Sequence, residues 1–406
     1  MNYDALVIGS GPAGGTAALL LAKAGWKIAI VEKARFPRRK VCGEFISATS
    51  FPLFHKLGIA RPFLDLAGPE VRDVGLFAGE TVLSSPMPRL KNSDGTWGRA
   101  LGREHLDTLL LTSAAAAGAV VWQPCAVTEL QRSNEGFICK IATKGAMKEL
   151  RARIVIAAHG SWEPGALPTQ TVYRERSKAD LFAFKAQFRD CDLQIGLMPL
   201  LVFPGGYGGM VHTDNNHVSL SCCIRRDYLQ RLRRRFQNIK AAEAVLMHIK
   251  TSCRGVRDTL AQAQLENAWL SAGPIQPGIR KRYLQGIFLV GNAAGEAHPI
   301  VAEGISMAMQ SAWLLCEHLI ERQQAVLSGK ELETVATKYS SAWHAAFAAR
   351  IRSAALFAHI AMRPGCVAAL LPMLKRFPRI LTLGAQLSGK AKQLITVPRS
   401  NIMLSR

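Results

Sequence analysis

Six consecutive residues near the N-terminus have the types and the spacing to bind a pyrophosphate: Gly9, Ser10, Gly11, Pro12, Ala13 and Gly14. In this GxGxxG pattern the first glycine permits a tight turn, the second lets the phosphates approach the backbone, and the third lets the following helix pack closely. Glu32 lies 18 residues beyond Gly14, where a carboxylate can accept hydrogen bonds from a ribose 2′-hydroxyl. The pattern predicts a dinucleotide site, with Pro12, Ala13 and Lys33 as further contacts.

The elements around this motif are those that must position it. Residues 3–8 form an apolar run typical of a buried parallel strand, residues 13–24 are rich in Ala and Leu and predict a helix, and residues 27–31 predict a second strand. The free N–H groups and partial positive charge of the helix N-terminus would face the phosphates. This context makes an ordinary glycine-rich turn the weaker interpretation.

A second glycine-containing segment lies far along the chain. Residues 285–290 predict a strand that runs into Gly291-Asn292-Ala293-Ala294-Gly295. Pro299 and Gly304 follow, and a helix is predicted over 305–321. Together with the N-terminal motif, this segment resembles the flavoproteins of the p-hydroxybenzoate hydroxylase superfamily, most closely their geranylgeranyl-reductase-like branch.

The resemblance implies that FAD is the cofactor, that Gly291 and Pro299 belong to its site, and that residue 292 contacts the ribityl chain. It also implies that the amides around Gly304 and Ile305 face the flavin pyrimidine edge, where a helix N-terminus stabilises negative charge. Asn292 replaces the family's usual Asp. Because an amide oxygen still accepts a hydrogen bond, FAD binding is expected.

Two further family motifs fall in the first half of the chain. Residues 103–107 resemble an Arg-x-x-Leu-Asp helix start, which implies that Arg103 lies near FAD; an exposed first-turn arginine is the alternative. His159-Gly160 stands where the family has Asp-Gly. A histidine cannot supply a permanent negative charge, so hydroxylase-type handling of NAD(P)H is placed in doubt, and a packed loop residue is the favoured interpretation.

The candidates for catalysis begin in the loop after Glu32. Its Lys40-Val41-Cys42-Gly43 sequence resembles the Lys-x-Cys-Gly loop that approaches the flavin in geranylgeranyl reductases. Cys42 is therefore a candidate pocket thiol or proton donor, with a structural thiol as the alternative. Glu44 is either an acid that relays protons beside the flavin or a solvated loop charge. His298, in the second flavin segment, is a further catalytic candidate.

Tyr207 is the fourth catalytic candidate. It lies in residues 204–212, which resemble the reductase branch's Pro-x-Gly-Tyr-x-Trp-x-Phe-Pro strand. Gly209, Val211 and His212 stand where that pattern has Trp, Phe and Pro. The loss of two large aromatics predicts a wider pocket, so the family's prenyl substrate is not carried over. The alternative for Tyr207 is a core aromatic of the sheet.

The predicted fold class is α/β, or α+β overall. A discontinuous Rossmann-like FAD-binding domain is expected from residues 1–162 and 284–325, an antiparallel β-sheet substrate domain from 163–283, and a basic helical C-terminal region from 326–406. Short alternating apolar runs predict the antiparallel sheet, at residues 181–188, 197–203, 210–212 and 217–223.

The charge distribution implies an anionic partner. The formal net charge is +22, and the stretch from Thr334 to Arg406 has eleven Lys or Arg and no Asp or Glu. Six Arg and one acid occur in residues 225–235. Basic faces beside apolar ones favour an acidic carrier protein or an anionic membrane surface, with a solvated helical cap as the alternative. No nucleic acid is expected, because a reader motif is missing.

Cysteine usage and hydropathy indicate the compartment. The nine cysteines are odd in number and include no CxxC, so neither a metal site nor a disulfide framework is expected. No run of about 18 uncharged apolar residues is seen, which argues against a transmembrane helix. A cytoplasmic protein is predicted, with peripheral membrane attachment as the variant that the basic region suggests.

These inferences predict an FAD-dependent oxidoreductase, either a reductase or a monooxygenase. NAD(P)H is its expected reductant. Its expected substrate is a bulky apolar metabolite of lipid or secondary-metabolite biosynthesis, which a carrier protein or a membrane could hold. One alternative is a flavin-dependent halogenase, although the WxWxIP segment of tryptophan halogenases is missing. The other is a non-catalytic basic docking protein on a flavoprotein scaffold.

Overall fold

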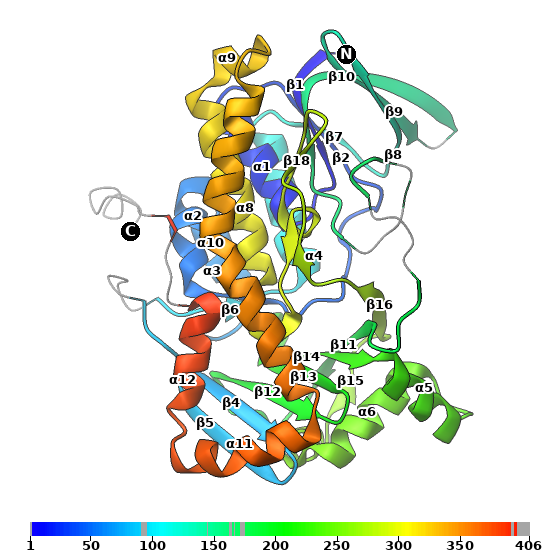
Figure 1. Ribbon diagram of the computed structural model, residues 1–406, viewed down its shortest axis with the longest axis vertical. Coiled ribbons are helices and arrows are strands. Elements are labelled where there is room, and N and C mark those ends of the chain that lie inside the picture. Colours follow the sequence, from blue (N-terminus) through cyan, green and yellow to red (C-terminus); the bar gives the residue numbers. More distant parts are fainter. Residues whose placement is uncertain are drawn as a thin grey trace.

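The computed structural model describes residues 2–90, 96–143, 145–161, 165, 167–170, 175–390 and 394–395. Two β-sheets lie at opposite ends of the molecule, and helices run along and between them (Figure 1). The predicted mixed α/β architecture is confirmed.

The first sheet contains the parallel strands that the N-terminal motif requires. Its strands, in spatial order, are β18 (Tyr283–Leu284), β19 (Ile287–Leu289), β10 (Ala146–Ala157), β1 (Asn2–Ile8), β2 (Ile28–Val31) and β7 (Val120–Trp122). β1 pairs in parallel with both β2 and β10, while β18 and a hairpin of β8 (Ala126–Ser133) and β9 (Gly136–Thr143) are antiparallel additions. β2 is buried throughout, as is usual for parallel strands covered on both faces.

Three helices pack together beside this sheet: α1 (Pro12–Lys23), α4 (Arg103–Ala116) and α8 (Gly304–Glu321). Every residue of α1 except Lys23 is buried, because α1 contacts both α4 and α8. The strands and helices predicted at the two flavin motifs thus coincide with β1, α1, β2 and α8 to within one or two residues. The strand expected at 285–290 is shorter, as β19.

The second sheet is mainly antiparallel. Its strands, in spatial order, are β15 (Gln264–Leu265), β11 (Leu181–Arg189), β14 (Val218–Arg225), β13 (Gly206–His212), β12 (Leu197–Phe203), β4 (Asp73–Ala78) and β5 (Thr81–Pro86). β16 (Leu270–Ile275) also pairs with β11. The four predicted runs are β11, β12, β13 and β14. β4 and β5 lie within residues 1–162, which were predicted to belong to the FAD-binding domain. The second sheet is therefore built from that segment as well as from the predicted substrate domain, residues 163–283.

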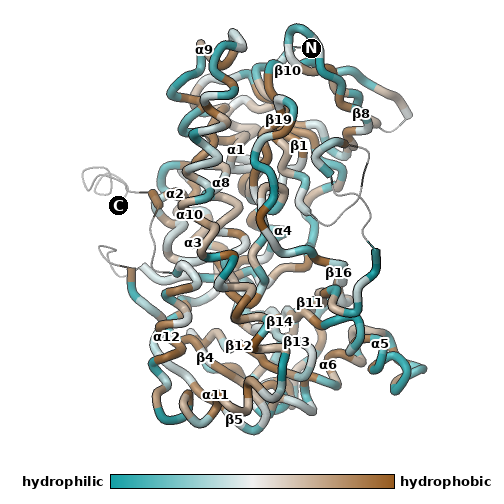
Figure 2. The backbone as a smooth tube through the Cα atoms, viewed as in Figure 1, coloured by the Kyte–Doolittle hydropathy of each residue, from teal (hydrophilic) through white to brown (hydrophobic). Residues whose placement is uncertain are grey.

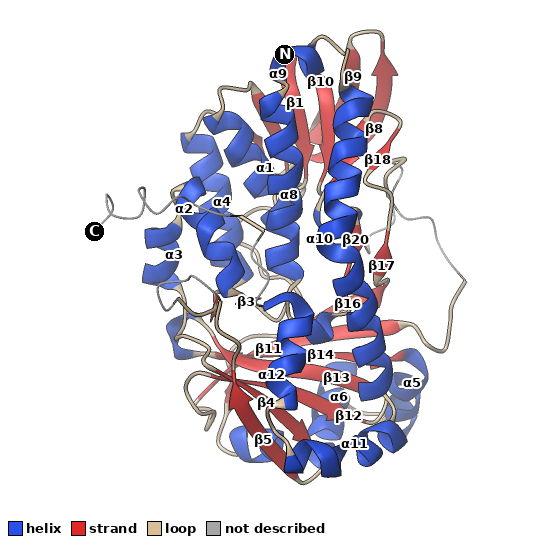
Figure 3. Cartoon of the chain, turned by 60° about the vertical axis from the view of Figure 1, so that its left-hand side comes forward, coloured by secondary structure: helices blue, strands red, loops and turns tan. Residues whose placement is uncertain are grey.

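Helices cover both faces of the second sheet. α5 (Arg226–Arg235), α6 (Ala241–Ser252) and α7 (Arg254–Thr259) pack on one face. On the other side lie α10 (Leu332–Ala361), α11 (Pro364–Arg376) and α12 (Ile380–Ala385). Figure 3 shows α10 running past both sheets, and it contacts α8, β13 and β17 (Gly278–Ile279).

Candidate active site

A cavity of about 750 Å³ lies between the two sheets. It brings together, from segments far apart in sequence, nearly all of the residues that were predicted for the site. Its lining includes Gly9, Gly11, Pro12, Ala13, Glu32, Lys33, Arg103, Gly291, Asn292, Pro299, Gly304 and Ile305 from the cofactor set, and Cys42, Glu44, Tyr207 and His298 from the catalytic set. Gly14 packs behind the lining.

The turn after β1 has the shape of a phosphate cradle. Gly9 has a φ of +95°, and a Cβ there would lie 2.7 Å from the carbonyl oxygen of Ala158. A Cβ on Gly14 would lie 1.8 Å from the carbonyl oxygen of Gly9. At Gly11, in contrast, the nearest atom to an added Cβ is Nη2 of Arg103 at 3.4 Å. A side chain at Gly11 would therefore occupy cavity space rather than protein.

Glu32 is held ionised at the end of β2. Its Oε2 accepts hydrogen bonds from the backbone N–H of Ser10 at 2.9 Å and the Ser10 hydroxyl at 3.1 Å, and Oε1 accepts one from Ala34 N–H at 2.8 Å. Burial acts to raise the pKa of Glu32, but the Arg38 charge and these hydrogen bonds together lower it below its ordinary value. The carboxylate can thus accept a hydrogen bond from a ribose hydroxyl.

Four cations converge on this end of the cavity: Lys33, Arg38, Lys40 and Arg103. Burial, followed by the charges of Arg38 and Arg103, lowers the pKa of Lys40 to about 8. Nε and Nη1 of Arg38 are buried without a hydrogen-bond partner among the described residues. Arg103 pairs with Asp107 through two hydrogen bonds of 2.8 and 2.6 Å. An anion in the cavity would relieve the repulsion and satisfy the orphaned donors, so the residues fit a pyrophosphate.

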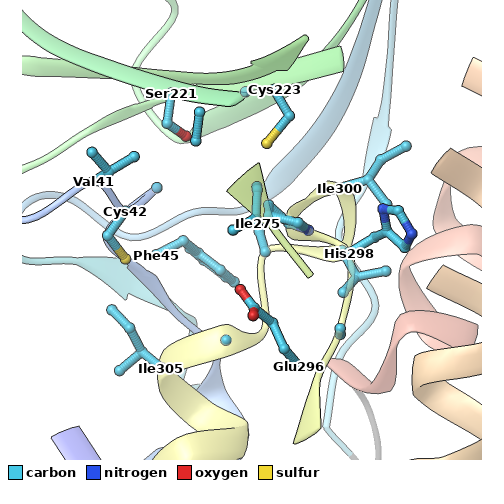
Figure 4. Close-up of a pocket in the computed structure, with 18 of the residues that line it drawn as sticks. Val41, Cys42, Phe45, Ser221, Cys223, Ile275, Glu296, His298, Ile300 and Ile305 are labelled. Atoms are coloured by element: carbon cyan, nitrogen blue, oxygen red, sulfur yellow. The ribbon is translucent and has the colours of Figure 1, made fainter. Parts of the chain in front are cut away.

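The second flavin segment borders the same cavity, and its first residue, Gly291, packs beside Ala13 of the N-terminal motif. Asn292 borders it, and Nη1 of Arg280 donates to the Asn292 carbonyl oxygen at 2.9 Å. Gly304 and Ile305 form the first turn of α8, whose N-terminus borders the cavity. Figure 4 shows Ile305 at the start of this helix, with the side chain of Cys42 near it. A helix N-terminus there would stabilise a negatively charged ring.

Glu44 is neither solvated nor unpaired. Both its side chain and that of Lys185 on β11 are fully buried, and the Lys185 ammonium donates to Glu44 Oε1. Nε2 of Gln187 reaches Oε2 of Glu44 at 3.4 Å, and the Arg103 backbone N–H donates to Oε1 at 3.2 Å. The alternative of a solvated loop charge is therefore wrong, because this carboxylate links the Cys42 loop to the second sheet and to α4.

Tyr207 and His298 meet across the cavity. The Tyr207 hydroxyl lies 3.2 Å from Nδ1 of His298, and it also interacts with the thiol of Cys223. Burial raises the pKa of Tyr207 well above its ordinary value and lowers the pKa of His298 to about 4. Figure 4 shows the side chain of Cys223 pointing from β14 into the cavity, toward Ile275. The group is a neutral hydrogen-bonded set that can hold or pass one proton.

The depressed pKa of His298 predicts acid sensitivity. The unfolded chain takes up a proton near pH 6.5, whereas the folded protein does so only near pH 4. Stability should therefore be full above pH 6.5 and fall by about 1–2 kcal/mol toward pH 5 through this group. We expect His298→Asn to reduce that loss, as measured by urea unfolding at the two pH values. His344→Asn, at an exposed position on α10, is the matched control; equal slopes for both variants would contradict the assignment.

His159 lines the cavity as a packed loop residue. Its Nδ1 lies 3.0 Å from the Gly160 carbonyl oxygen and its Nε2 lies 2.9 Å from the Thr169 hydroxyl. Burial lowers its pKa, so the ring is neutral. It therefore lacks the negative charge of the Asp that the family places there, and both of its ring nitrogens already have hydrogen-bond partners.

A buried ionic cluster at the N-terminus of α8 was missed from sequence. Glu303 is fully buried, with Lys390 Nζ at 3.5 Å from Oε1 and Arg350 Nη1 at 3.8 Å from Oε2. The Ser47 hydroxyl donates to Oε2 at 3.3 Å. The cluster thus connects Lys390, near the end of the described residues, to the N-terminus of α8. Its only sequence signal is an acid in an apolar stretch, Val301-Ala302-Glu303-Gly304-Ile305.

The comparisons with known proteins agree with this geometry. A family model described as FAD binding domain matches residues 2–354, and the chain belongs to this family. A digeranylgeranylglycerophospholipid reductase 1 of Methanothermobacter thermautotrophicus is 26% identical over 320 residues, which cover 77% of this chain and 76% of the relative. The chain is thus an FAD-dependent oxidoreductase, and the resemblance to the reductase-like branch is confirmed.

Solved structures share the fold. The geranylgeranyl bacteriochlorophyll reductase-like protein Ta0516 of Thermoplasma acidophilum has a TM-score of 0.66 and 20% identity, over 99% of this chain and 95% of that one. The flavin-dependent brominase Bmp2 has a TM-score of 0.74 and 16% identity, over 96% and 94%. At these identities the likeness shows the fold alone.

Proposed function

We propose that this oxidoreductase reduces a carbon–carbon double bond in a long apolar substrate, with NAD(P)H as the source of the hydride. The observation that carries the proposal is the far wall of the cavity. It is formed by apolar side chains of α10, α11 and α12, among them Phe357, Ile360, Val367, Leu370, Leu374 and Leu381. Such a wall suits a hydrocarbon chain and offers no partner for a polar group.

The residues around the cavity provide separate subsites for the cofactor and for the chain. FAD would supply reversible hydride transfer to a carbon atom of the substrate. The phosphate cradle at Gly11 and the carboxylate of Glu32 would hold one end of FAD. Asn292 and the first turn of α8 would hold its other end. Tyr207, kept protonated by burial, faces the cavity beside His298 and is positioned to deliver the proton that must accompany a hydride.

The test is product analysis with the purified holoenzyme. Protein reduced with NADH or NADPH without oxygen is mixed with detergent-dispersed polyprenyl lipids, and the products are examined by mass spectrometry. We expect a gain of two hydrogen atoms per double bond. Incorporation of one oxygen atom when air is admitted, or of a halogen when halide is present, would replace the reductase assignment with a monooxygenase or a halogenase.

Gly209 should set the width of the chain subsite. A Cβ there would find only the Pro199 carbonyl oxygen, at 3.5 Å, whereas a Cβ on neighbouring Gly208 would lie 2.7 Å from the Ser221 carbonyl oxygen. Gly209→Phe should therefore fold, narrow the cavity and lower kcat/KM for branched chains about ten-fold, with a smaller effect on unbranched ones. Gly209→Ala is the control. Equal losses for both kinds of chain would place the substrate elsewhere.

A further inference from the structure

Helix α11 is apolar along most of its length although none of its residues is fully buried. Its sequence, PGCVAALLPMLKR, has no charged residue before Lys375, and none of its residues is fully covered by the rest of the protein. A helix that is hydrophobic all round is normally found in a protein core or in a membrane. In Figure 2 the tube at α11 is largely white to brown, at the edge of the molecule.

One side of this helix faces the cavity. Val367, Leu370 and Leu374 line it, together with Leu381 and Gly384 of α12. The helix pair thus separates the chain subsite from the surroundings of the protein. A passage through or beside the pair would lead an apolar chain directly into this subsite.

Large apolar groups along this part of the chain are also exposed, and one of them, Met373, borders the cavity as well. Met373 is 43% exposed, Phe377 56%, Leu383 55% and Leu387 65%. These four residues, here called the strip, lie on α11, just after its C-terminal end, on α12 and in the helical turn that follows α12. An exposed strip of this kind marks an interaction surface.

The charged residues in the sequence from the start of α11 to the end of α12 are all positive. Arg363 precedes α11, Lys375 and Arg376 end it, and Arg379 precedes α12, and all four are exposed. The Gly205 N–H donates to the carbonyl oxygen of Met362, between α10 and α11, at 3.2 Å, and Gly205 lies against the ring of Tyr228 in the arginine-rich α5. The start of α5 therefore lies near the turn between α10 and α11, although α5 itself packs on the opposite face of the second sheet.

We propose that helices α11 and α12 form a docking surface for an anionic lipid bilayer and admit the apolar substrate from it. This inference rests on the proposed function for the nature of that substrate. Exposed Met, Phe and Leu side chains would enter the headgroup region while Arg and Lys contact lipid phosphates. Among the described residues no single helix is long and apolar enough to cross a membrane. α10 and α11 meet the requirements of length and composition only when they are taken together, across a bend of 100°.

A bilayer suits this surface better than an acidic carrier protein does. An acidic carrier protein would bind to a surface whose polar rim offers specific hydrogen-bond partners. Protruding apolar side chains between Lys and Arg residues instead suit a bilayer, in which fluid acyl chains lie beneath a layer of phosphates. The exposed apolar residues also continue directly into the residues that line the cavity.

The first experiment places α11 relative to lipid. Cys366 lies exposed on α11, so a polarity-sensitive thiol fluorophore can be attached to the native chain. With phosphatidylcholine vesicles that contain phosphatidylglycerol, we expect co-sedimentation and a blue shift of the label. Both effects should weaken in pure phosphatidylcholine and as salt rises, because charges are screened over about 8 Å at physiological salt. The Cys366→Ser protein controls for labelling elsewhere.

The second experiment uses matched variants. Met373→Asp with Phe377→Asp should lower vesicle partitioning at least about ten-fold. Met147→Asp with Ile195→Asp, which also replaces exposed apolar residues but at a distance in sequence, should leave it unchanged. Lys375→Glu with Arg376→Glu and Arg379→Glu should remove the preference for anionic vesicles. All variants should retain FAD, which shows that they fold.

The outcomes separate the two proposals. A protein that ignores both kinds of vesicle at low salt, or whose binding is unchanged by the α11 variants, would overturn the docking surface. Binding of an acidic carrier protein that the Glu variants abolish, without vesicle binding, would replace the bilayer with that carrier. Vesicle binding by a protein that reduces no detergent-dispersed chain would instead overturn the proposed reductase activity and leave the surface intact.

Discussion

Gly11→Val is expected to yield folded protein without flavin. An added side chain at Gly11 meets only Nη2 of Arg103, at 3.4 Å, so it points into the cavity and does not displace protein atoms. The branched side chain would occupy the space in which the pyrophosphate approaches the backbone, and FAD affinity should fall by a factor of about 100 or more. Flavin absorbance per mole of purified protein is the measurement.

Two comparisons make this result specific. Circular dichroism should be unchanged for Gly11→Val, because the fold does not depend on that cavity space. Gly14→Val should instead fail to fold, since its Cβ would lie 1.8 Å from the Gly9 carbonyl oxygen. Yellow Gly11→Val protein with parental flavin content would show that the pyrophosphate lies elsewhere.

Lys185→Met should destabilise the protein far more than the loss of a solvent-exposed lysine does. Its removal leaves the Glu44 carboxylate fully buried with only neutral hydrogen-bond donors. Breaking a buried pair in this way costs about 3–5 kcal/mol of unfolding free energy. Urea or guanidinium denaturation of the holoenzyme provides the measurement.

The double variant Glu44→Gln with Lys185→Met keeps this prediction testable if the single variant does not fold. We expect it to recover much of the loss, because no unpaired charge remains in the interior. Lys140→Met removes a lysine from a solvent-exposed pair with Glu129 and should change stability little. Equal midpoints for Lys185→Met and the parent would show that the buried pair contributes nothing.

The parts of the fold that could be predicted are those with local sequence signals. The glycine spacing, the apolar run of β1 and the Ala/Leu-rich α1 specify the phosphate cradle within 32 residues. The second flavin segment carries a comparable signal before α8. Each of these depends on contacts between residues close in sequence or on a fixed backbone turn, so spacing alone constrains the structure.

Pairings between distant residues could not be predicted in the same way. Glu44 and Lys185 are separated by 141 positions, and only the burial of both reveals that they neutralise each other. A lysine within the apolar strand Leu181–Arg189 was the available signal, because a charge in a buried strand requires a partner. Likewise β4 joins the second sheet through pairing with β12, a contact that no local pattern specifies, and β5 follows through pairing with β4.

Helix α10 determines how the molecule can move. Its 30 residues extend for about 45 Å. Near its beginning the Tyr339 hydroxyl donates to the Leu289 carbonyl oxygen in the first sheet at 2.8 Å, and just beyond its end Met362 accepts the hydrogen bond from the turn that precedes β13. A strut fixed to both sheets resists any hinge between them. We therefore expect the distance from the phosphate cradle to the chain subsite to stay constant through turnover, and substrate exchange to depend on movement of the short helices α11 and α12.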